Sequence, residues 1–113
     1  MKKEEVITKL MKAVSVHNKA IDESTKIKVD INNAEFVLAD KVASIYLEKD
    51  AKELGSNAEI RNANIALMTE SEKALIRNLT NNLELAKAKE HKARNEVEQF
   101  KYIIRALDLQ NEI

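Results

Sequence analysis

The 113-residue sequence contains nineteen basic and nineteen acidic side chains, so its formal net charge at pH 7 is zero. Charge is also balanced within each half, which leaves no basic arm for nucleic acid and no charged membrane anchor. The chain has no cysteine, which excludes disulfides, thiolate catalysis and zinc sites built on sulfur. Four aromatic residues are few for a compact core, and a helical assembly rich in Leu, Ile, Val and Ala fits this composition better.

The length is ordinarily that of one domain, and we expect a single helical domain over residues 1–113. The first residues, MKKEEVITKL, are charged and are not followed by the apolar core of a signal peptide. No apolar run approaches the roughly 20 residues of a membrane-spanning helix. These features predict a cytoplasmic protein without a membrane partner.

The first arm of the chain, residues 1–54, begins with apolar residues at helical spacing: Ile7, Leu10, Val14, His17 and Ile21. The stretch STKIKVDINN, residues 24–33, then alternates apolar and charged side chains, a pattern typical of a strand. Because no partner strand can be identified, a kink, a loop and a continued helix all stay open for residues 24–33.

Residues 34–54 carry two apolar stripes. The first consists of Ala34, Leu38, Val42 and Ile45. The second lies nearly opposite on a helix and consists of Phe36, Ala43, Leu47 and Leu54. A helix that is apolar on two sides is buried on two sides. Either the chain folds back into three or four helices, or the second stripe is covered by self-association.

The only glycine, Gly55, lies almost at the midpoint of the chain. Glycine closes a helix without steric cost, and Ser56 followed by Glu59 has the spacing of a capping box that would open the next helix. Two arms of similar length joined by a tight turn describe an antiparallel helical hairpin. The sequence therefore predicts a corner at Gly55, with the second arm over residues 56–113.

The second arm carries the strongest pattern in the sequence. Ten residues follow heptad spacing, and all except Glu90 are apolar: Ile76, Leu79, Leu83, Ala86, Glu90, Ala93, Val97, Phe100, Ile104 and Leu107. This row, here called the α-helical seam, predicts one long helix that packs on a partner helix. Thr69 and Glu72 resemble a capping box, so the second arm either breaks near residue 69 or continues through it.

The polar residues near the seam do not form the pattern of a catalytic or metal-binding site. A polar residue such as Glu90 on a seam commonly fixes register, and simple exposure is the alternative. His17 and His91 have no partner at the spacing that a metal site or a catalytic pair would need. With one glycine and no cysteine, no phosphate loop or nucleophilic site can be assembled. We expect no catalytic residue, no metal, no cofactor and no enzymatic activity.

The densest basic region comprises Lys87, Lys89, Lys92, Arg94 and Lys101. Such residues usually pair with acids on the facing helix, and the available acids are Glu35, Asp40, Glu48 and Asp50. The alternative is a nucleic-acid contact, which would be weak and sensitive to salt because no aromatic side chains are interleaved for base stacking.

The segment LGSNAEIRNA, with the Ala/Leu-rich helix that follows it, resembles small helical proteins encoded in phage and prophage genomes of low-GC bacteria. The matching residues are Gly55, Asn57, Glu59 and Arg61, and the resemblance covers about residues 34–109. It implies a helix that ends at a glycine and a second helix that closes the chain. Phage proteins of this kind act by binding, as accessory factors or as inhibitors of a host system.

Together these patterns predict an all-α, coiled-coil-like hairpin that functions as a non-enzymatic protein–protein interaction module. The expected partners are a second copy, as a dimer or tetramer, or another protein that a phage accessory or inhibitory protein would bind. The expected surface consists of Phe36, Ala43, Leu47 and Leu54, with Val97, Phe100 and Ile104. The alternative is a nucleic-acid-binding accessory protein for replication or recombination that uses the basic region.

Overall fold

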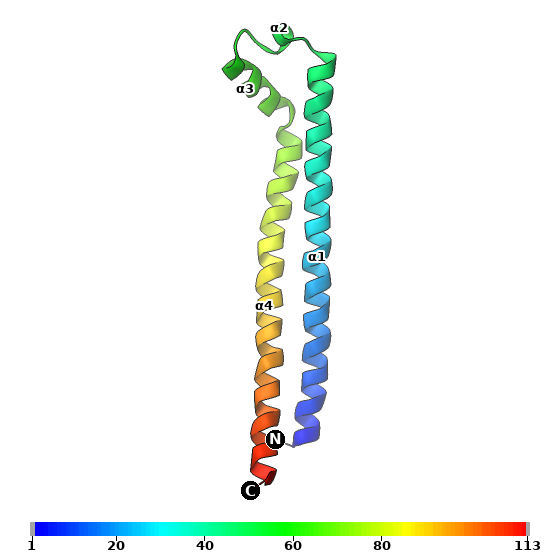
Figure 1. The fold of residues 1–113 in the computed structure, drawn as a ribbon, viewed down its shortest axis with the longest axis vertical. Coiled ribbons are helices and arrows are strands. Elements are labelled where there is room, and N and C mark those ends of the chain that lie inside the picture. The colour runs from blue at the N-terminus through cyan, green and yellow to red at the C-terminus, as the bar shows by residue number, and fades with distance from the viewer. Residues whose placement is uncertain (1, 113) are drawn as a thin grey trace. The chain divides into compact units, whose positions relative to one another are not determined.

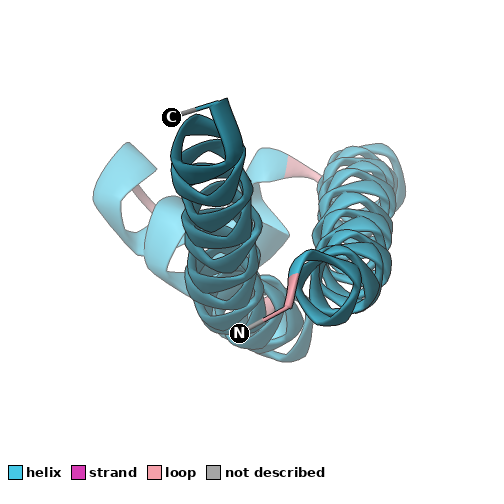
Figure 2. Cartoon of the chain, turned by 90° about the horizontal axis from the view of Figure 1, so that it is seen from below, coloured by secondary structure: helices cyan, strands magenta, loops and turns pink. Residues whose placement is uncertain are grey.

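The computed structural model describes residues 2–112, except for the side chains of Ala51 and Glu112. Two long helices, α1 (Lys3–Glu48) and α4 (Glu70–Glu112), form the arms of a helical hairpin (Figure 1). Two short helices, α2 (Ala51–Leu54) and α3 (Ala58–Met68), connect them. Residues 2–112 contain helices and short loops but no strand (Figure 2). The predicted all-α hairpin is confirmed.

The chain divides into two compact units. The first unit combines the part of α1 up to Lys26 with the part of α4 from Leu83 onward. The second unit, Ile27–Asn82, holds the remainder of α1, the two short helices and the beginning of α4. A single domain over the whole chain stays a prediction.

Residues 24–33 belong to α1, which runs without a break from Lys3 to Glu48. Of the three possibilities left open for this stretch, the continued helix is therefore the one observed. Ile27 and Ile31 are half-buried because they are four residues apart and share one helix face, whereas Val29 lies exposed on another face. The period-two alternation reflects two apolar faces of one helix.

The buried face of α1 in the first unit differs from the predicted one. Its members, at alternating intervals of four and three, are Val6, Leu10, Ala13, His17 and Ala20. Leu10 and His17 were expected there, but Ile7, Val14 and Ile21 remain between 37% and 39% exposed. The physical reason is the small size of Ala13 and Ala20, which lets α4 approach closely and leaves the larger neighbouring side chains outside the contact.

The seam of α4 agrees with the prediction. All ten residues of the predicted seam are buried or half-buried, and Ala86, Ala93 and Val97 are the most completely covered. Within the first unit, these residues pack on the face of α1 that carries Ala13 and Ala20. Alanines on both helices therefore place the two backbones close together.

Polar contacts set the register of the first unit. The Nζ atom of Lys3 lies 2.6 Å from Oδ1 of Asp108, and the hydrogen bond to this carboxylate raises the pKa of Lys3. Further along the pair, the Ser24 hydroxyl lies 2.9 Å from Oε2 of Glu90 and 3.0 Å from the carbonyl oxygen of Ile21. Glu90 is thus a half-buried seam residue with a partner on α1, and a shift in register would separate that partner from it.

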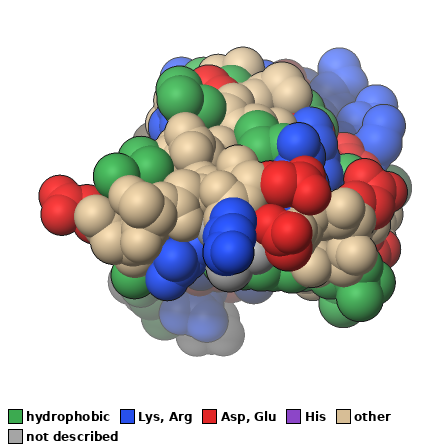
Figure 3. All heavy atoms as spheres, turned by 90° about the horizontal axis from the view of Figure 1, so that it is seen from above, with side chains coloured by type: hydrophobic (Ala, Val, Ile, Leu, Met, Phe, Trp, Pro, Cys, Tyr) green, Lys and Arg blue, Asp and Glu red, His purple; other side chains and the backbone are tan. Residues whose placement is uncertain are grey.

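The second unit is organised around the connection at Gly55. Gly55 has φ +150°, a conformation that other residues rarely adopt, and an added Cβ would lie 2.6 Å from Cγ2 of Ile60. A small core fills the space behind this corner, formed by Ile45, Leu54 and Ile65. At the outside of this end, acidic, basic and apolar side chains are interspersed (Figure 3). The predicted corner at Gly55 is present between α2 and α3.

The residue that caps α3 is Asn57, one position after the expected Ser56 and Glu59 box. The Asn57 side chain accepts a hydrogen bond of 2.9 Å from the backbone N–H of Ile60. Arg61 and Asn64 donate from α3 to the carbonyl oxygens of Gly55 and Leu54, at 3.4 Å and 2.5 Å. Two side chains of α3 therefore fix the backbone of the turn through its carbonyl oxygens.

Capping by Asn57 predicts a difference between two neighbouring alanine variants. Asn57→Ala leaves an N-terminal amide of α3 without its acceptor, and we expect the free energy of unfolding to fall by about 1 kcal/mol. Ser56→Ala is the matched control and should lower the free energy of unfolding by less than half as much. Urea unfolding followed by circular dichroism measures both, and equal effects would contradict the assignment of the cap.

Thr69 separates α3 from α4 but does not form the predicted N-terminal capping box. Its hydroxyl donates backward to the carbonyl oxygen of Ile65 at 2.8 Å, and the residue is fully buried as the C-cap of α3. Burial explains the difference, because the side chain faces the protein interior and bonds to the helix that it ends. The break near residue 69 is thus present, but Thr69 ends α3 as its C-cap instead of beginning α4 as an N-cap.

In the second unit, Lys41 of α1 donates to Oε1 of Glu72 on α4 at 2.5 Å. This hydrogen bond lowers the pKa of Glu72 below its usual value of 4.5. A carboxyl whose pKa is lower in the folded state than in the unfolded state stabilises the fold, and this contribution is complete at any pH well above the unfolded-state pKa. Its contribution is lost as the pH falls through the lower pKa of the folded protein.

The Lys41–Glu72 pair therefore predicts a pH-dependent effect of Glu72→Gln. At pH 7 the variant should melt at a lower temperature than the wild type, because the charged acceptor is gone. As the pH falls from about 4.5 through the lowered pKa of the folded protein, the wild-type carboxyl also becomes uncharged, so the two melting temperatures should converge. Thermal unfolding at pH 7 and over this acidic range measures the difference, and an unchanged gap would show that the pair contributes nothing.

Candidate interaction surface

An apolar stripe runs along α1 on the side opposite its buried face in the second unit. Phe36 is 70% exposed and Leu47 is 88% exposed, and Ala43 lies between them on the same side. Val29, seven residues before Phe36, extends the stripe and was not identified from the sequence, although the same heptad spacing reaches it. We call Val29, Phe36, Ala43 and Leu47 the outer stripe.

The other residues of the expected surface lie elsewhere. Leu54 is only 2% exposed, because it belongs to α2 and packs against Ile45 and Ile65 in the core of the second unit. Val97, at 6% exposed, and the half-buried Phe100 and Ile104 belong to the α4 seam of the first unit. These four side chains are covered within the chain, so the outer stripe retains only Phe36, Ala43 and Leu47 of the seven.

Acidic residues flank the outer stripe around Phe36, Ala43 and Leu47. Glu35 and Glu48 are exposed on its flanks, and Asp40 lies on the stripe itself, one turn from both Phe36 and Ala43. Asn32, Glu35 and Ala39 line a shallow hollow of about 390 Å³ beside Phe36. From Phe36 to Leu47 the outer stripe is therefore an apolar face with acidic flanks and one carboxylate in its middle, whereas Lys28 is exposed beside Val29 at its N-terminal end.

The basic region of α4 is interspersed with acids. Lys87 lies 3.6 Å from Glu84, and Lys101 lies 3.3 Å from Glu98, both on the same helix. Lys89 lies 3.8 Å from Glu23 of α1. None of these partners is among the four acids expected from the sequence, because all four of those acids belong to the second unit, whereas the basic region and Glu23 belong to the first.

Arg94 completes the basic region without a carboxylate partner among the described contacts. Its Nη2 lies 2.9 Å from Nδ1 of His91. The basic side chains of α4 are thus interspersed with acidic and neutral ones.

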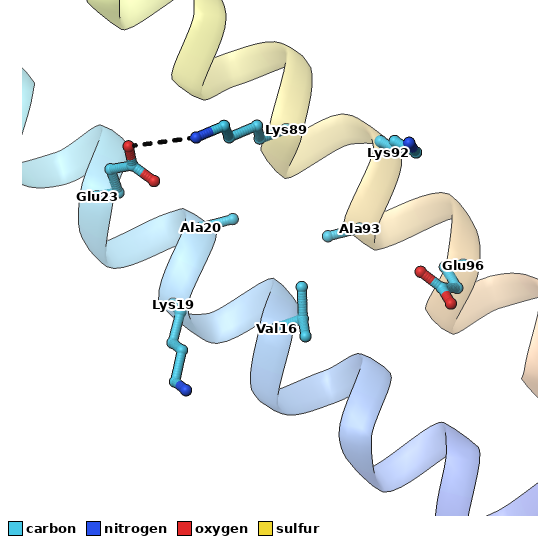
Figure 4. Close-up of a pocket in the computed structure, with 8 residues that line it drawn as sticks. All are labelled: Val16, Lys19, Ala20, Glu23, Lys89, Lys92, Ala93 and Glu96. Atoms are coloured by element: carbon cyan, nitrogen blue, oxygen red, sulfur yellow. Dashed lines mark ion pairs between the residues drawn. The ribbon is translucent and has the colours of Figure 1, made fainter.

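A groove runs between α1 and α4 on one face of the first unit (Figure 4). It consists of two hollows of about 390 and 320 Å³ that share Val16 and Glu96. Ala20 and Ala93 point toward each other across its floor, while Lys19 and Lys92 extend away from its middle. The groove lies above this alanine contact, between the longer side chains that flank it on the two helices.

The rim of the groove is predominantly basic. Five lysines line the two hollows, against two glutamates, Glu23 and Glu96; the lysines are Lys9, Lys12, Lys19, Lys89 and Lys92. Two of these, Lys89 and Lys92, belong to the basic region identified from the sequence. The sequence did not predict the groove itself, although alanines repeating at intervals of seven residues on both helices are a signal for closely packed helices.

Other kinds of site have little support among the described residues. Residues 2–112 contain no group of three His, Cys, Asp or Glu side chains arranged to hold a metal ion. Within the same residues, no helix has a stretch long and apolar enough to cross a lipid bilayer. In the comparisons with known proteins, the chain matches no family model, no curated protein and no solved structure.

Proposed function

We propose that this protein is a non-enzymatic helical interaction module that self-associates through the outer stripe of α1. The observation that carries the proposal is the exposure of Phe36 and Leu47 on a face whose residues repeat at heptad spacing. Large apolar side chains that line up on one helix face are usually covered by another helix.

The arrangement of the hairpin supports self-association over an internal cover for this face. In the second unit Lys41 of α1 pairs with Glu72 of α4, and Ile45 packs with Leu54 of α2 and Ile65 of α3, all on the side of α1 opposite the outer stripe. Residues 3–26, which could have formed a separate helix that folds back, are instead part of α1. The resemblance to phage-encoded helical proteins would make such a module an accessory or inhibitory protein that acts by binding.

Leu47→Glu tests this proposal directly. Glutamate at position 47 would replace a large apolar side chain of the contact with a charged one, and the desolvation of that charge costs on the order of several kcal/mol. We therefore expect self-association to weaken by more than about tenfold, so that the sedimenting species approaches the 12.8 kDa of one chain. Sedimentation over a wide range of concentration measures the change.

The matched control is Leu85→Glu, because Leu85 is also an exposed leucine of a long helix, at 66%, but lies off the outer stripe. This variant should retain the wild-type mass. A wild-type protein that sediments as a monomer at every concentration, or a Leu47→Glu variant with unchanged mass, would remove the proposed function.

A further inference from the structure

The outer stripe is poorly suited to contact a second copy of itself. Asp40 lies on the stripe, so an isologous contact would bring two copies of this carboxylate into one apolar interface. Glu35 and Glu48 on the flanks would add like charges on both sides. Like charges brought together at an interface oppose association, so a better partner is an apolar surface with a basic border.

The groove of the first unit has that combination. Ala13, Ala20 and Ala93 form an apolar floor and are 5–8% exposed, while Val16, 55% exposed, contributes a larger apolar side chain. Its rim carries the five lysines described above. Lys89 is partly neutralised by Glu23, but the remaining lysines outnumber Glu96 on the rim. The groove thus complements the charge of the outer stripe.

The repeat lengths also match. Val29, Phe36 and Ala43 recur every seven residues on the outer stripe, and Ala13 and Ala20 recur at the same interval on the groove floor, as do Ala86 and Ala93 on α4. In packed helices, side chains at heptad spacing on one helix insert between side chains at heptad spacing on the others. The stripe can therefore occupy the groove as the third helix of a local bundle.

We propose that the outer stripe of α1 in one copy docks into the basic groove between α1 and α4 of a second copy, an inference that rests on the proposed self-association. The aromatic ring of Phe36 and the side chain of Leu47 would lie over the small residues of the groove floor. Asp40 and the flanking glutamates would face the rim lysines. This is helix-in-groove recognition with charge selecting the orientation.

Such a contact is heterologous, because the donor face and the acceptor groove are different surfaces. Each copy carries one of each, so two copies can exchange them reciprocally, or further copies can be added. The same property allows the two surfaces to be inactivated separately, in two different variants.

The test uses two full-length variants. Leu47→Glu disables the stripe and leaves the groove intact; Lys12→Glu combined with Lys92→Glu reverses one charge on each side of the groove and leaves the stripe intact. Each variant alone should lose self-association by more than about tenfold. An equimolar mixture should form a 1:1 complex that stops at two chains of 12.8 kDa each, because only one productive contact remains.

A matched control is Lys87→Glu combined with Lys101→Glu, which changes net charge equally but lies outside the groove lining. This control should associate as the wild type does, and added salt should weaken wild-type association. Circular dichroism confirms that all variants remain helical, and Lys9→Gln with Lys19→Gln replaces the groove variant if it unfolds.

The outcomes separate the two proposals. If the folded groove variant keeps the wild-type mass while Leu47→Glu dissociates, the stripe contacts some other surface, which overturns the groove inference and leaves the proposed function standing. Two monomeric variants that fail to combine on mixing also overturn the groove inference. If Leu47→Glu keeps the wild-type mass, the proposed function fails.

Discussion

Leu54→Ala should lower the free energy of unfolding by about 2–5 kcal/mol, the range measured when a buried leucine is truncated to alanine. Leu54 is 2% exposed and packs with Ile45 and Ile65, which are the other buried members of a small core. So few side chains have limited means of closing the cavity that truncation creates. The upper part of this range would therefore be expected.

Leu67→Ala is the control, because Leu67 lies nearby in α3 but is 76% exposed. Chemical unfolding of both variants should show a large loss for Leu54 and a change within about 0.5 kcal/mol for Leu67. Comparable losses at the two positions would show that the connection around Gly55 has no core of the kind described.

Ala93→Leu should also destabilise the protein strongly, for the opposite reason. Ala93 is 5% exposed and faces Ala20 at the close approach of α1 and α4 (Figure 4). A larger side chain forces the helices apart or takes a strained rotamer, which typically costs about 1–3 kcal/mol. The loss should be cooperative, because separation at one heptad weakens the contacts of its neighbours.

The same substitution at Ala88, an exposed alanine on α4, provides the control and should be nearly neutral. Thermal and urea unfolding of both variants measure the difference. If Ala93→Leu were as stable as the wild type, the helices would have room for a side chain between them, and the alanine contact would not determine their spacing.

The sequence predicted α4 better than α1 because the two helices encode their contacts differently. On α4 the seam consists mainly of large apolar side chains, such as Leu83 and Val97, which stand out from a charged background. On α1 the buried face is marked by Ala13 and Ala20, and the larger Ile7, Val14 and Ile21 beside them displaced the predicted row to one side of that face, although Leu10 and His17 belong to both. Size is a poor guide to burial where two backbones approach closely.

The turn was predicted at the correct residue, but its hydrogen bonds were not. Gly55 is unambiguous because no other residue of the chain has its conformational freedom. Ser56 and Asn57 are both good caps, however, and the choice between them depends on the direction from which α3 leaves the turn. Thr69 shows the same limit, since burial decided whether its hydroxyl bonded forward or backward.

The candidate surface was predicted in part. Phe36, Ala43 and Leu47 were identified because they form a second apolar stripe opposite the first one on the same helix. A helix that packs on the first stripe cannot also cover the second. It placed Leu54 on the same stripe by assuming that α1 continues past Glu48, and the chain turns away before that residue. The groove depends on the distance between two helices that are far apart in the sequence, and one amino-acid sequence does not specify that distance.

The pairing of Lys3 with Asp108 has a mechanical consequence. A force applied at these two residues would peel α1 from α4 one turn at a time, beginning at this ion pair, instead of loading all their contacts in parallel. Rupture in this unzipping direction requires little force at each step, because only a few side chains resist at any moment. The protein would therefore open gradually under tension and close again from the contacts that had not yet separated.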